Sequence, residues 1–453
     1  MGIIALLMKN KSFAALGLLS SITLLASAQT GKKPNIVFIL ADDLGYGDVS
    51  WLNKEGKIPT PNIDKIAKEG VVFTDAHSSS AVSTPTRYGI LTGRYNWRST
   101  LKGGVLGGFS EALIPENRTT MASMLKKQGY RTACIGKWHL GWTWNNKEKG
   151  NANVDYSKPI THGPTSLGFD YFFGIPASLD MDPYLYVEND KPTSLPNRTT
   201  EGTNLKVGDP GYDGQFWRKG LTGSDFDHSD CLPNFVGRAA SYIKSSSAKE
   251  APYFLYLALP APHTPLLPSK EFQGKSGINA YADFVLMVDN EIGKLLKAID
   301  ESGEQSNTLV VFASDNGCSP AADFETLKSK GHNPSYRFRG HKADLFDGGH
   351  RIPCMVRWPA ALSPKTVDAT ICLTDFLSTF AAVAGYKLQD NEGEDSFDLM
   401  PLLAGSKHRP TCARQPSPTL STEVLPSGKG NGNYFSRPAR VDGAIPGREK
   451  TTK

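Results

Sequence analysis

The chain has 453 residues, of which 39% are hydrophobic and 21% are charged, a composition typical of a globular protein that buries a large core. The formal net charge is only +5 and no long run of lysine and arginine is present, so the sequence does not indicate a nucleic-acid-binding protein. An anionic small-molecule substrate remains compatible with this charge balance.

The first residues have the features of an export signal. Lys9 and Lys11 precede an apolar run over residues 13–25, and Ala-Ser-Ala at 26–28 supplies a small-x-small cleavage pattern. The apolar run is too short to span a bilayer, so we expect no stable membrane anchor. We therefore expect a signal peptide over residues 1–28, recognition by export machinery, and a bacterial protein that is periplasmic or secreted.

Beyond this segment, short apolar runs alternate with helical patterns, which predicts an α/β fold with a mostly parallel sheet. Continuous apolar runs are typical of strands buried on both faces. In chain order the expected strands are 35–40, 71–73, 131–135, 253–259, 309–313 and 354–358. The expected helices are 61–68, 85–92, 121–127, 235–244, 281–299 and 375–383.

Two stretches lack such patterns. Residues 141–234 are rich in Gly, Pro, Asn and Asp, so we interpret them as a long loop excursion within one catalytic domain over 29–405. Residues 406–453 are rich in Pro, Gly, Ser and basic residues without sustained alternation, so an irregular, disordered tail is expected. The six cysteines lack metal-type spacing; we expect mostly free thiols, and pairing stays open.

The stretch Ser83–Arg87 places a hydroxyl and a guanidinium at a helix start. Pro85 suits the first helical position and Thr84 the N-cap, while Gly93 suits a left-handed stop. Ser83 would then lie at the positive end of a helix, where free N–H groups favour an anion, with Arg87 on the same face. Taken alone, this spacing fits a capped surface helix equally well.

Four of the predicted strands end directly in polar residues. These residues are Asp42 and Asp43, Lys137 and His139, His263, and Asp315 and Asn316. The carboxyl ends of parallel strands form one ligand-binding edge, so we expect these side chains to share a site with Ser83 and Arg87. The oxygen-rich members suit a hard cation such as calcium or magnesium. The basic members, together with Lys342, suit a small tetrahedral anion.

These motifs resemble the type I sulfatases in their serine form. The resemblance is carried by Ser83–Arg87 with Leu91–Arg94, and in order by residues 34–47, 136–141, 260–265, 314–317 and 339–353. Residues 167–174 resemble the branch of arylsulfatase A and N-acetylgalactosamine-6-sulfatase. The resemblance implies an alkaline-phosphatase-like sandwich whose large mixed, mostly parallel sheet is flanked by helices.

The C-terminal sequence departs from that family. Related enzymes continue into a small antiparallel subdomain, which we expect to be missing or disrupted here. A truncation or a change of reading frame near His408 would account for the departure.

The resemblance implies a sulfuric ester hydrolase in which an anaerobic radical maturation enzyme oxidises Ser83 to formylglycine (3-oxoalanine). The hydrated aldehyde would be the nucleophile, and residue 83 would bind calcium together with Asp42, Asp43, Asp315 and Asn316. The remaining implied roles are the following: Arg87 holds the hydrate, Lys137 and Lys342 bind sulfate oxygens, Asp315 accepts the nucleophile's proton, His263 protonates the leaving alcohol, and His139 assists the final elimination.

The expected substrate is a sulfated host or algal glycan. Loop residues near the motifs that are candidates for sugar contacts are Trp97, Arg98, His162, Asp180, Asp182 and His228. Two alternatives stay open, a phosphate- or phosphonate-ester hydrolase on the same scaffold and an inactive glycan-binding relic. Related two-zinc phosphatases carry histidine where Asn316 stands, which favours a single metal.

Overall fold

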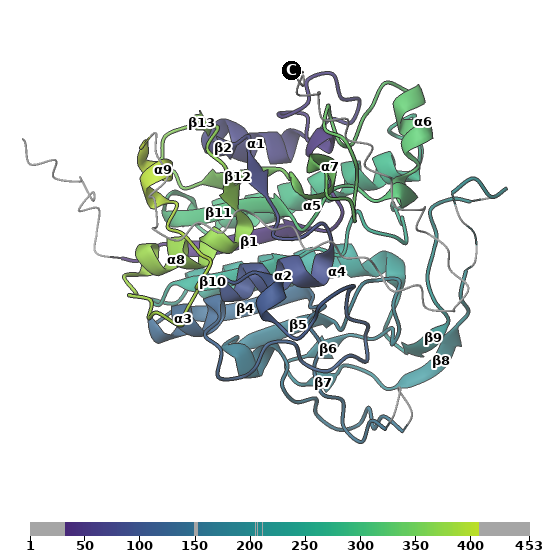
Figure 1. The fold of residues 1–453 in the computed structure, drawn as a ribbon. Coiled ribbons are helices and arrows are strands. Elements are labelled where there is room, and N and C mark those ends of the chain that lie inside the picture. Colours follow the sequence, from purple (N-terminus) through teal and green to yellow (C-terminus); the bar gives the residue numbers. More distant parts are fainter. Residues whose placement is uncertain (1–31, 149–152, 204, 206, 211, 407–453) are drawn as a thin grey trace, which may run out of the picture.

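The computed structural model describes residues 32–148, 153–203, 205, 207–210 and 212–406 (Figure 1). The predicted signal peptide, the predicted tail beyond residue 406, the expected loss of the C-terminal subdomain and Cys412 fall outside the described residues. Within them, helices cover both faces of a central sheet, as Figure 1 shows.

Ten strands of the described chain form one mixed sheet in the order β13-β2-β12-β11-β1-β10-β4-β5-β6-β7. The neighbours β11, β1, β10, β4 and β5 run parallel, whereas β12, β6 and β7 run antiparallel to their partners. The strands are β1 Asn35–Ala41, β2 Val71–Phe73, β3 Ala76–His77, β4 Arg131–Lys137, β5 Tyr171–Ile175, β6 Val187–Glu188, β7 Lys191–Pro192, β8 Pro196–Thr200, β9 Gly220–Gly223, β10 Tyr253–Ala258, β11 Thr308–Ser314, β12 Cys354–Arg357, β13 Lys365–Val367 and β14 Ile371–Cys372. The predicted α/β fold with a mostly parallel sheet is confirmed.

The sheet separates two apolar cores because both faces of its central strands are buried. Phe38 packs with α2, α3, α8 and α9 on one face, and Val37 and Ile39 pack with α1, α4 and α5 on the other (Figure 1). The helices are α1 Pro61–Glu69, α2 Ser83–Thr92, α3 Met121–Lys127, α4 Cys231–Ser247, α5 Ala280–Glu301, α6 Phe324–Ser329, α7 Asp347–His350, α8 Phe376–Ala384 and α9 Met400–Ala404. The helices cover the two faces of the sheet and leave the ends of its strands uncovered.

The predicted loop excursion over 141–234 contains more regular structure than its weak periodicity suggested. β5 continues the main sheet beside β4, β6 and β7 extend the sheet further, and β8 pairs with β9 in a separate ribbon. These strands have two to five residues each. Elements this short owe their form to pairing with a neighbour rather than to a local pattern.

Two glycines allow β10, β4 and β5 to approach each other at their carboxyl ends. A Cβ on Gly136 would lie 1.9 Å from the carbonyl oxygen of Ala258, and one on Gly174 would lie 1.9 Å from the carbonyl oxygen of Gly136. Gly136 also has φ of +113°, which L side chains rarely adopt. The close backbone contacts at Gly136 and Gly174 therefore fix the positions of the residues that follow β4 and β5.

The start of α2 differs from the prediction. The helix begins at Ser83, with Val82 as the N-cap, and Gly93 ends it in the left-handed conformation as predicted. Thr84 is not the cap, because its hydroxyl donates to the carbonyl of His139 (3.0 Å) and accepts from the amide of Leu106 (3.1 Å). Those tertiary bonds hold Thr84 inside the helix, and Ser83 stands in the first turn.

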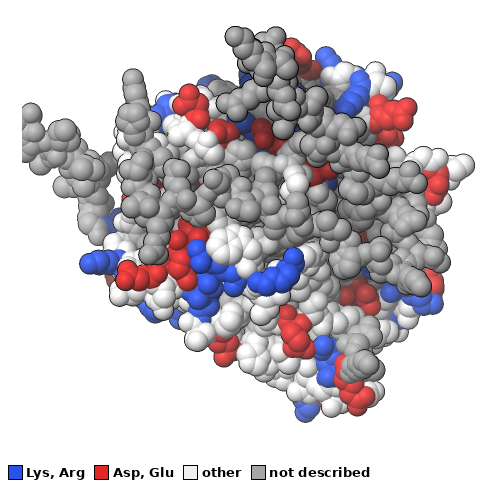
Figure 2. Space-filling model, viewed as in Figure 1, with Lys and Arg blue, Asp and Glu red and all other residues white. Residues whose placement is uncertain are grey.

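Three further observations concern the helices, the surface charges and the cysteines. No helix in the described segments has the length and apolarity needed to cross a bilayer. On the face seen in Figure 2, basic and acidic side chains are interspersed. The five cysteines in the described ranges, Cys134, Cys231, Cys318, Cys354 and Cys372, are buried free thiols.

Candidate active site

The carboxyl ends of four adjacent parallel strands meet at one edge of the sheet. β1 pairs with β11 through Ala41 and Ser314, and β10 pairs with both β1 and β4 through Ala258. The strands therefore end at nearly the same level. The structure thus brings together the polar residues that follow β1, β4, β10 and β11, as the sequence predicted.

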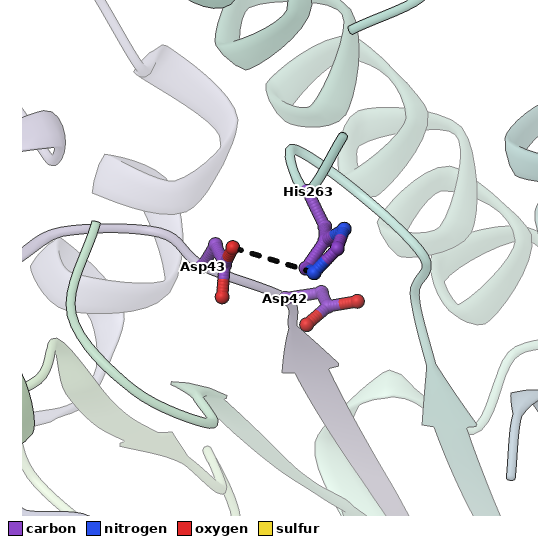
Figure 3. Close-up of side chains that lie close together, drawn as sticks. All are labelled: Asp42, Asp43 and His263. Atoms are coloured by element: carbon purple, nitrogen blue, oxygen red, sulfur yellow. Dashed lines mark ion pairs between the residues drawn. The ribbon is translucent and has the colours of Figure 1, made fainter. Parts of the chain in front are cut away.

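Three carboxylates and one amide form the acidic part of this edge. Asp42, Asp43, Asp315 and Asn316 are all buried. The amide N–H of Asp43 donates to Asp315 Oδ1 (3.2 Å), and Asn316 Nδ2 donates to Asp43 Oδ1 (2.7 Å). Figure 3 shows Asp42 and Asp43 at the end of β1, with His263 reaching toward Asp43 from the loop after β10. Ligand atoms of Asp42, Asp43 and His263 lie within 4.8 Å of one another.

Each carboxylate has a cationic partner. Lys137 Nζ lies 2.7 Å from Asp42 Oδ2, Lys342 Nζ lies 2.8 Å from Asp43 Oδ2, and Arg87 Nη2 lies 2.8 Å from Asp315 Oδ2. Such pairing compensates for the high cost of burying charge.

The pKa values reflect these pairs. Burial on its own would raise the pKa of Asp42, but Lys137, His263 and Arg87 lower it to about 2. Asp43 raises the pKa of Lys342 despite the opposing effect of burial. Asp42 is therefore ionised and Lys342 protonated at neutral pH.

Ser83 lies at the centre of this charge network. Its side chain is buried in the first turn of α2. Its Oγ donates to Asp42 Oδ1 (3.2 Å) and accepts from Lys137 Nζ (3.2 Å). Arg87, one turn later, places Nη2 3.5 Å from Asp42 Oδ1, so both residues face the same side as predicted. A group at position 83 thus contacts a carboxylate and an ammonium at once.

The two histidines differ in how their rings are held. His263 Nδ1 lies 2.6 Å from the carbonyl of Thr264, which assigns the proton to Nδ1 and turns Nε2 toward Asp43 Oδ2 (3.7 Å). His139 Nε2 lies 2.7 Å from the carbonyl of Leu106, and its Nδ1 is buried without a hydrogen-bond partner in the described chain. Burial and the nearby Lys137 hold the pKa of His139 well below its usual value, so its ring is neutral.

Sequence reasoning missed one residue of the cluster. Ser178 Oγ accepts from Lys137 Nζ (2.9 Å) and lies 3.3 Å from His263 Nε2, so it bridges the lysine and the histidine. Ser178 follows β5 just as the other site residues follow their strands. Recognising β5 as a fifth parallel strand is the signal that would have identified it.

The candidate sugar-contact residues separate into two groups. Among the described residues, Trp97, Arg98 and His162 make no hydrogen bond or ion pair with the cluster. Arg98 is held by Asp395 (2.7 Å) and lies over the Trp97 ring, and the nearest carboxylate to His162 is that of Glu116 at 3.9 Å.

The second group, Asp180, Asp182 and His228, lies on the side of β5. Asp180 is two residues beyond Ser178 and is paired with Arg218. Burial raises the pKa of Asp182, which is half-buried. His228 packs against Tyr184, with ring centroids 4.5 Å apart.

The residues of the acidic cluster fit a hard cation. Asn316 uses its Nδ2 to donate to Asp43 and to the carbonyl of Gly317, while its Oδ1 is buried with no hydrogen-bond partner in the described chain. An amide oxygen so placed among carboxylates is a typical calcium or magnesium ligand, and no thiolate is present in this set. Asp42, Asp43, Asp315 and Asn316 are therefore the residues that would hold such an ion.

Comparison with known proteins gives one consistent result. The sequence model of the sulfatase family matches residues 34–386. The chain is 36% identical to an N-acetylgalactosamine-6-O-sulfatase of Bacteroides thetaiotaomicron, over 84% of this chain and 78% of that protein. It is 29% identical to human arylsulfatase A, over 92% of this chain and 78% of that protein.

Solved structures agree with these relatives. One from work on the metabolism of multiple glycosaminoglycans by Bacteroides thetaiotaomicron matches with a TM-score of 0.73 and 36% identity, covering 83% of this chain and 82% of that one. Another, in complex with a neocarrahexaose, matches with a TM-score of 0.64 and 27% identity, covering 83% and 77%.

Proposed function

The chain belongs to the sulfatase family and is a sulfuric ester hydrolase, and on that premise we propose that it removes sulfate from a saccharide with a nucleophile made from Ser83 beside one calcium ion. The observation that carries the proposal is the position of Ser83 Oγ, which contacts both Asp42 and Lys137 among the buried ion pairs. A sulfate group bound there has cations around its oxygens and a hydroxyl-bearing residue at its sulfur.

When present, calcium held by Asp42, Asp43, Asp315 and Asn316 supplies a Lewis acid, and formylglycine at position 83 supplies after hydration an oxygen nucleophile with a second hydroxyl. The protein's side chains do the rest. Lys137 and Lys342 bind sulfate oxygens, since both ammonium groups reach the carboxylates that surround position 83. Arg87 holds Asp315 and Asp42 in place from the interior.

Proton transfers are assigned from the hydrogen bonds of the same side chains. His263 Nε2 faces the site while Nδ1–H is anchored to the carbonyl of Thr264, so we assign His263 as the acid: in its imidazolium form, with a proton on each nitrogen, it gives the Nε2 proton to the leaving alcohol and becomes neutral. His139 has a free lone pair on Nδ1 and a neutral ring, which suits a base in the release of sulfate. Asp315 is assigned as the acceptor of the nucleophile's proton from the family resemblance, whereas the hydroxyl of Ser83 itself donates to Asp42 Oδ1 (3.2 Å).

The proposed substrate is a sulfate ester on a sugar at the end of a glycan. The N-acetylgalactosamine-6-O-sulfatase relative supports this class. Oxidation of Ser83 requires the anaerobic radical maturation enzyme as a partner, and the predicted signal peptide would take the protein through export machinery to the periplasm or the exterior.

The test is expression of the full chain with an anaerobic maturation enzyme, followed by mass spectrometry of the peptide that contains residue 83. We expect the loss of two hydrogens relative to serine. We also expect sulfate release from sulfated saccharides and far slower turnover of the matched phosphate esters. Ser83→Ala is the control and should lower kcat by about 10⁴-fold or more. An active enzyme with an unmodified serine, or faster cleavage of phosphate esters, would contradict the proposal.

A further inference from the structure

Near the residues proposed to bind sulfate, the buried carboxylate of Asp180 has an oxygen to which the proposed mechanism gives no role. The Asp180 side chain is 6% exposed, and its Oδ2 accepts a hydrogen bond from Arg218 Nη1. The Asp180 carbonyl accepts from the amide of Arg218 (3.0 Å) and from the hydroxyl of Tyr184 (3.0 Å), which fixes the residue firmly. Oδ1 is buried and has no hydrogen-bond partner in the described chain. A buried acceptor left open in this way costs stability unless a ligand fills it.

A second unused polar atom lies on the other side of Tyr184. The single proton of the Tyr184 hydroxyl is shared between the carbonyls of Asp180 and Arg218 (2.6 Å to the latter), and the Tyr184 ring packs on His228 with centroids 4.5 Å apart. His228 Nε2 is buried and has no partner among the described residues. His228 also stacks on Trp217 with ring centroids 5.1 Å apart, and both rings, together with Leu267 of the loop after β10, line a pocket. Tyr184 thus contacts both Asp180 and His228, and His228 lines the pocket.

This group adjoins the proposed catalytic residues. Asp180 is two residues beyond Ser178, which contacts Lys137 and His263. Leu267 lies four residues beyond His263 on the same loop. Asp180 is also close enough to His263 and Lys137 for their charges to lower its pKa.

The charges of the group suit neutral hydroxyl ligands. Burial alone would raise the pKa of Asp180, but His263 and Arg218 hold it below its usual value, so the carboxylate is ionised at neutral pH. Burial lowers the pKa of His228 to about 4, which leaves its ring neutral. The side chain of Arg218 is 49% exposed and keeps N–H groups free to donate.

We propose that Asp180, Arg218 and His228 form the subsite that recognises the sugar bearing the sulfate ester. Asp180 Oδ1 accepts from one ring hydroxyl, Arg218 donates to a neighbouring hydroxyl, and the Trp217 ring, which stacks on His228, packs against the apolar face of the sugar. An adjacent acceptor and donor match vicinal hydroxyls, whereas a simple aryl ring offers neither. The inference rests on the proposed function and selects hydroxyl-bearing sugar sulfates over aryl sulfates.

The test compares two substrates on the matured full-length protein. For Asp180→Asn and Arg218→Ala, the ratio of kcat/KM for a hexosamine 6-sulfate to that for 4-nitrophenyl sulfate should fall about 10- to 100-fold, the range for a lost hydrogen bond to a charged group. With the wild type, sugar sulfates that lack the recognised hydroxyl should show the same fold loss in kcat/KM. With the variants, removal of that hydroxyl should lower kcat/KM little further. Arg238→Ala is the matched control, since Arg238 is 40% exposed and paired with Glu188 at 2.9 Å; its ratio should not change.

A second measurement separates this subsite from the proposed chemistry. Calorimetry with Ser83→Ala and the same sugar sulfate reports binding without turnover, and adding Asp180→Asn should weaken binding about 10-fold or more. Equal loss on both substrates would make Asp180 a positioning residue that acts through Ser178 and would overturn the subsite, as would an unchanged ratio or undiminished binding. Failure of the proposed function would appear differently, as a matured wild type that binds the sugar sulfate without releasing sulfate.

Discussion

The proposed sulfate site and the proposed sugar subsite differ in how their buried carboxylates are paired. At the ends of β1, β4 and β11, each carboxylate is neutralised by a lysine or arginine, and the Arg87 and Lys137 side chains have no exposed surface. Around Asp180, one carboxylate oxygen and one imidazole nitrogen lack partners in the described chain, and Arg218 is half-exposed. The proposed sulfate site thus contains the paired charges used in the proposed chemistry, whereas the region around Asp180 has hydrogen-bonding atoms available for a ligand.

Removal of a bound calcium ion should lower activity more than the other changes described below. It should act only on the proposed sulfate site. We expect a calcium chelator to lower kcat by about 100-fold or more, because a Lewis acid contributes several kcal/mol to charge stabilisation. The thermal midpoint should fall as well, since an ion that binds only the folded state stabilises it. Activity assays with and without added calcium, alongside metal analysis, check this. Full activity in a protein shown to be metal-free would contradict it.

Breaking one buried ion pair should cost more stability than breaking an exposed one. Arg87→Met leaves Asp315 uncompensated and should lower the free energy of unfolding by about 3–5 kcal/mol. Lys65→Ala, which removes a pair with Asp300 at 40% and 30% exposure, should cost about 1 kcal/mol or less. Urea denaturation of both variants measures the difference. Similar losses would mean that burial does not distinguish the site's charges from surface charges.

Near Asp180, the lowered pKa of His228 should make the free energy of unfolding decrease at acid pH. Burial holds the pKa of His228 at about 4, against 6.5 for an ordinary histidine. Above pH 6.5 the ring is neutral in both states; as pH falls toward 4, the unfolded chain binds the proton first and the free energy of unfolding decreases. At pH 5 this loss amounts to about 2 kcal/mol. Denaturation of wild type and His228→Gln at pH 7.5 and pH 5 should show a smaller drop for the variant, and parallel drops would contradict the assignment.

Much of the sulfate site could be predicted because its strands carry their own signal. Continuous apolar runs predict β1, β10 and β11, and parallel pairing then forces their terminal residues to one edge. The remainder depends on contacts between distant parts of the chain. β5 exists because it pairs with β4, so the place of Ser178 depends on a strand without local periodicity.

Contacts with distant residues also explain why Thr84 is not the predicted N-cap of α2 and why candidates such as Arg98 lie away from the site. Thr84 has the residue type of an N-cap, but bonds to His139 and Leu106 hold it inside α2. Arg98 is near the motif in sequence, yet Asp395, almost three hundred residues away, holds its guanidinium. Proximity in sequence is a poor guide when a side chain has a stronger partner elsewhere.

The burial of α2 has a consequence for the order of events in the protein's synthesis. Every residue of this helix is buried, and Ser83 is only 2% exposed. An enzyme that oxidised the Ser83 side chain would need access to it, which the packed helix does not give. The proposed modification would therefore have to precede folding. A chain that folded first would keep its serine, so the active fraction of a preparation would be set before folding.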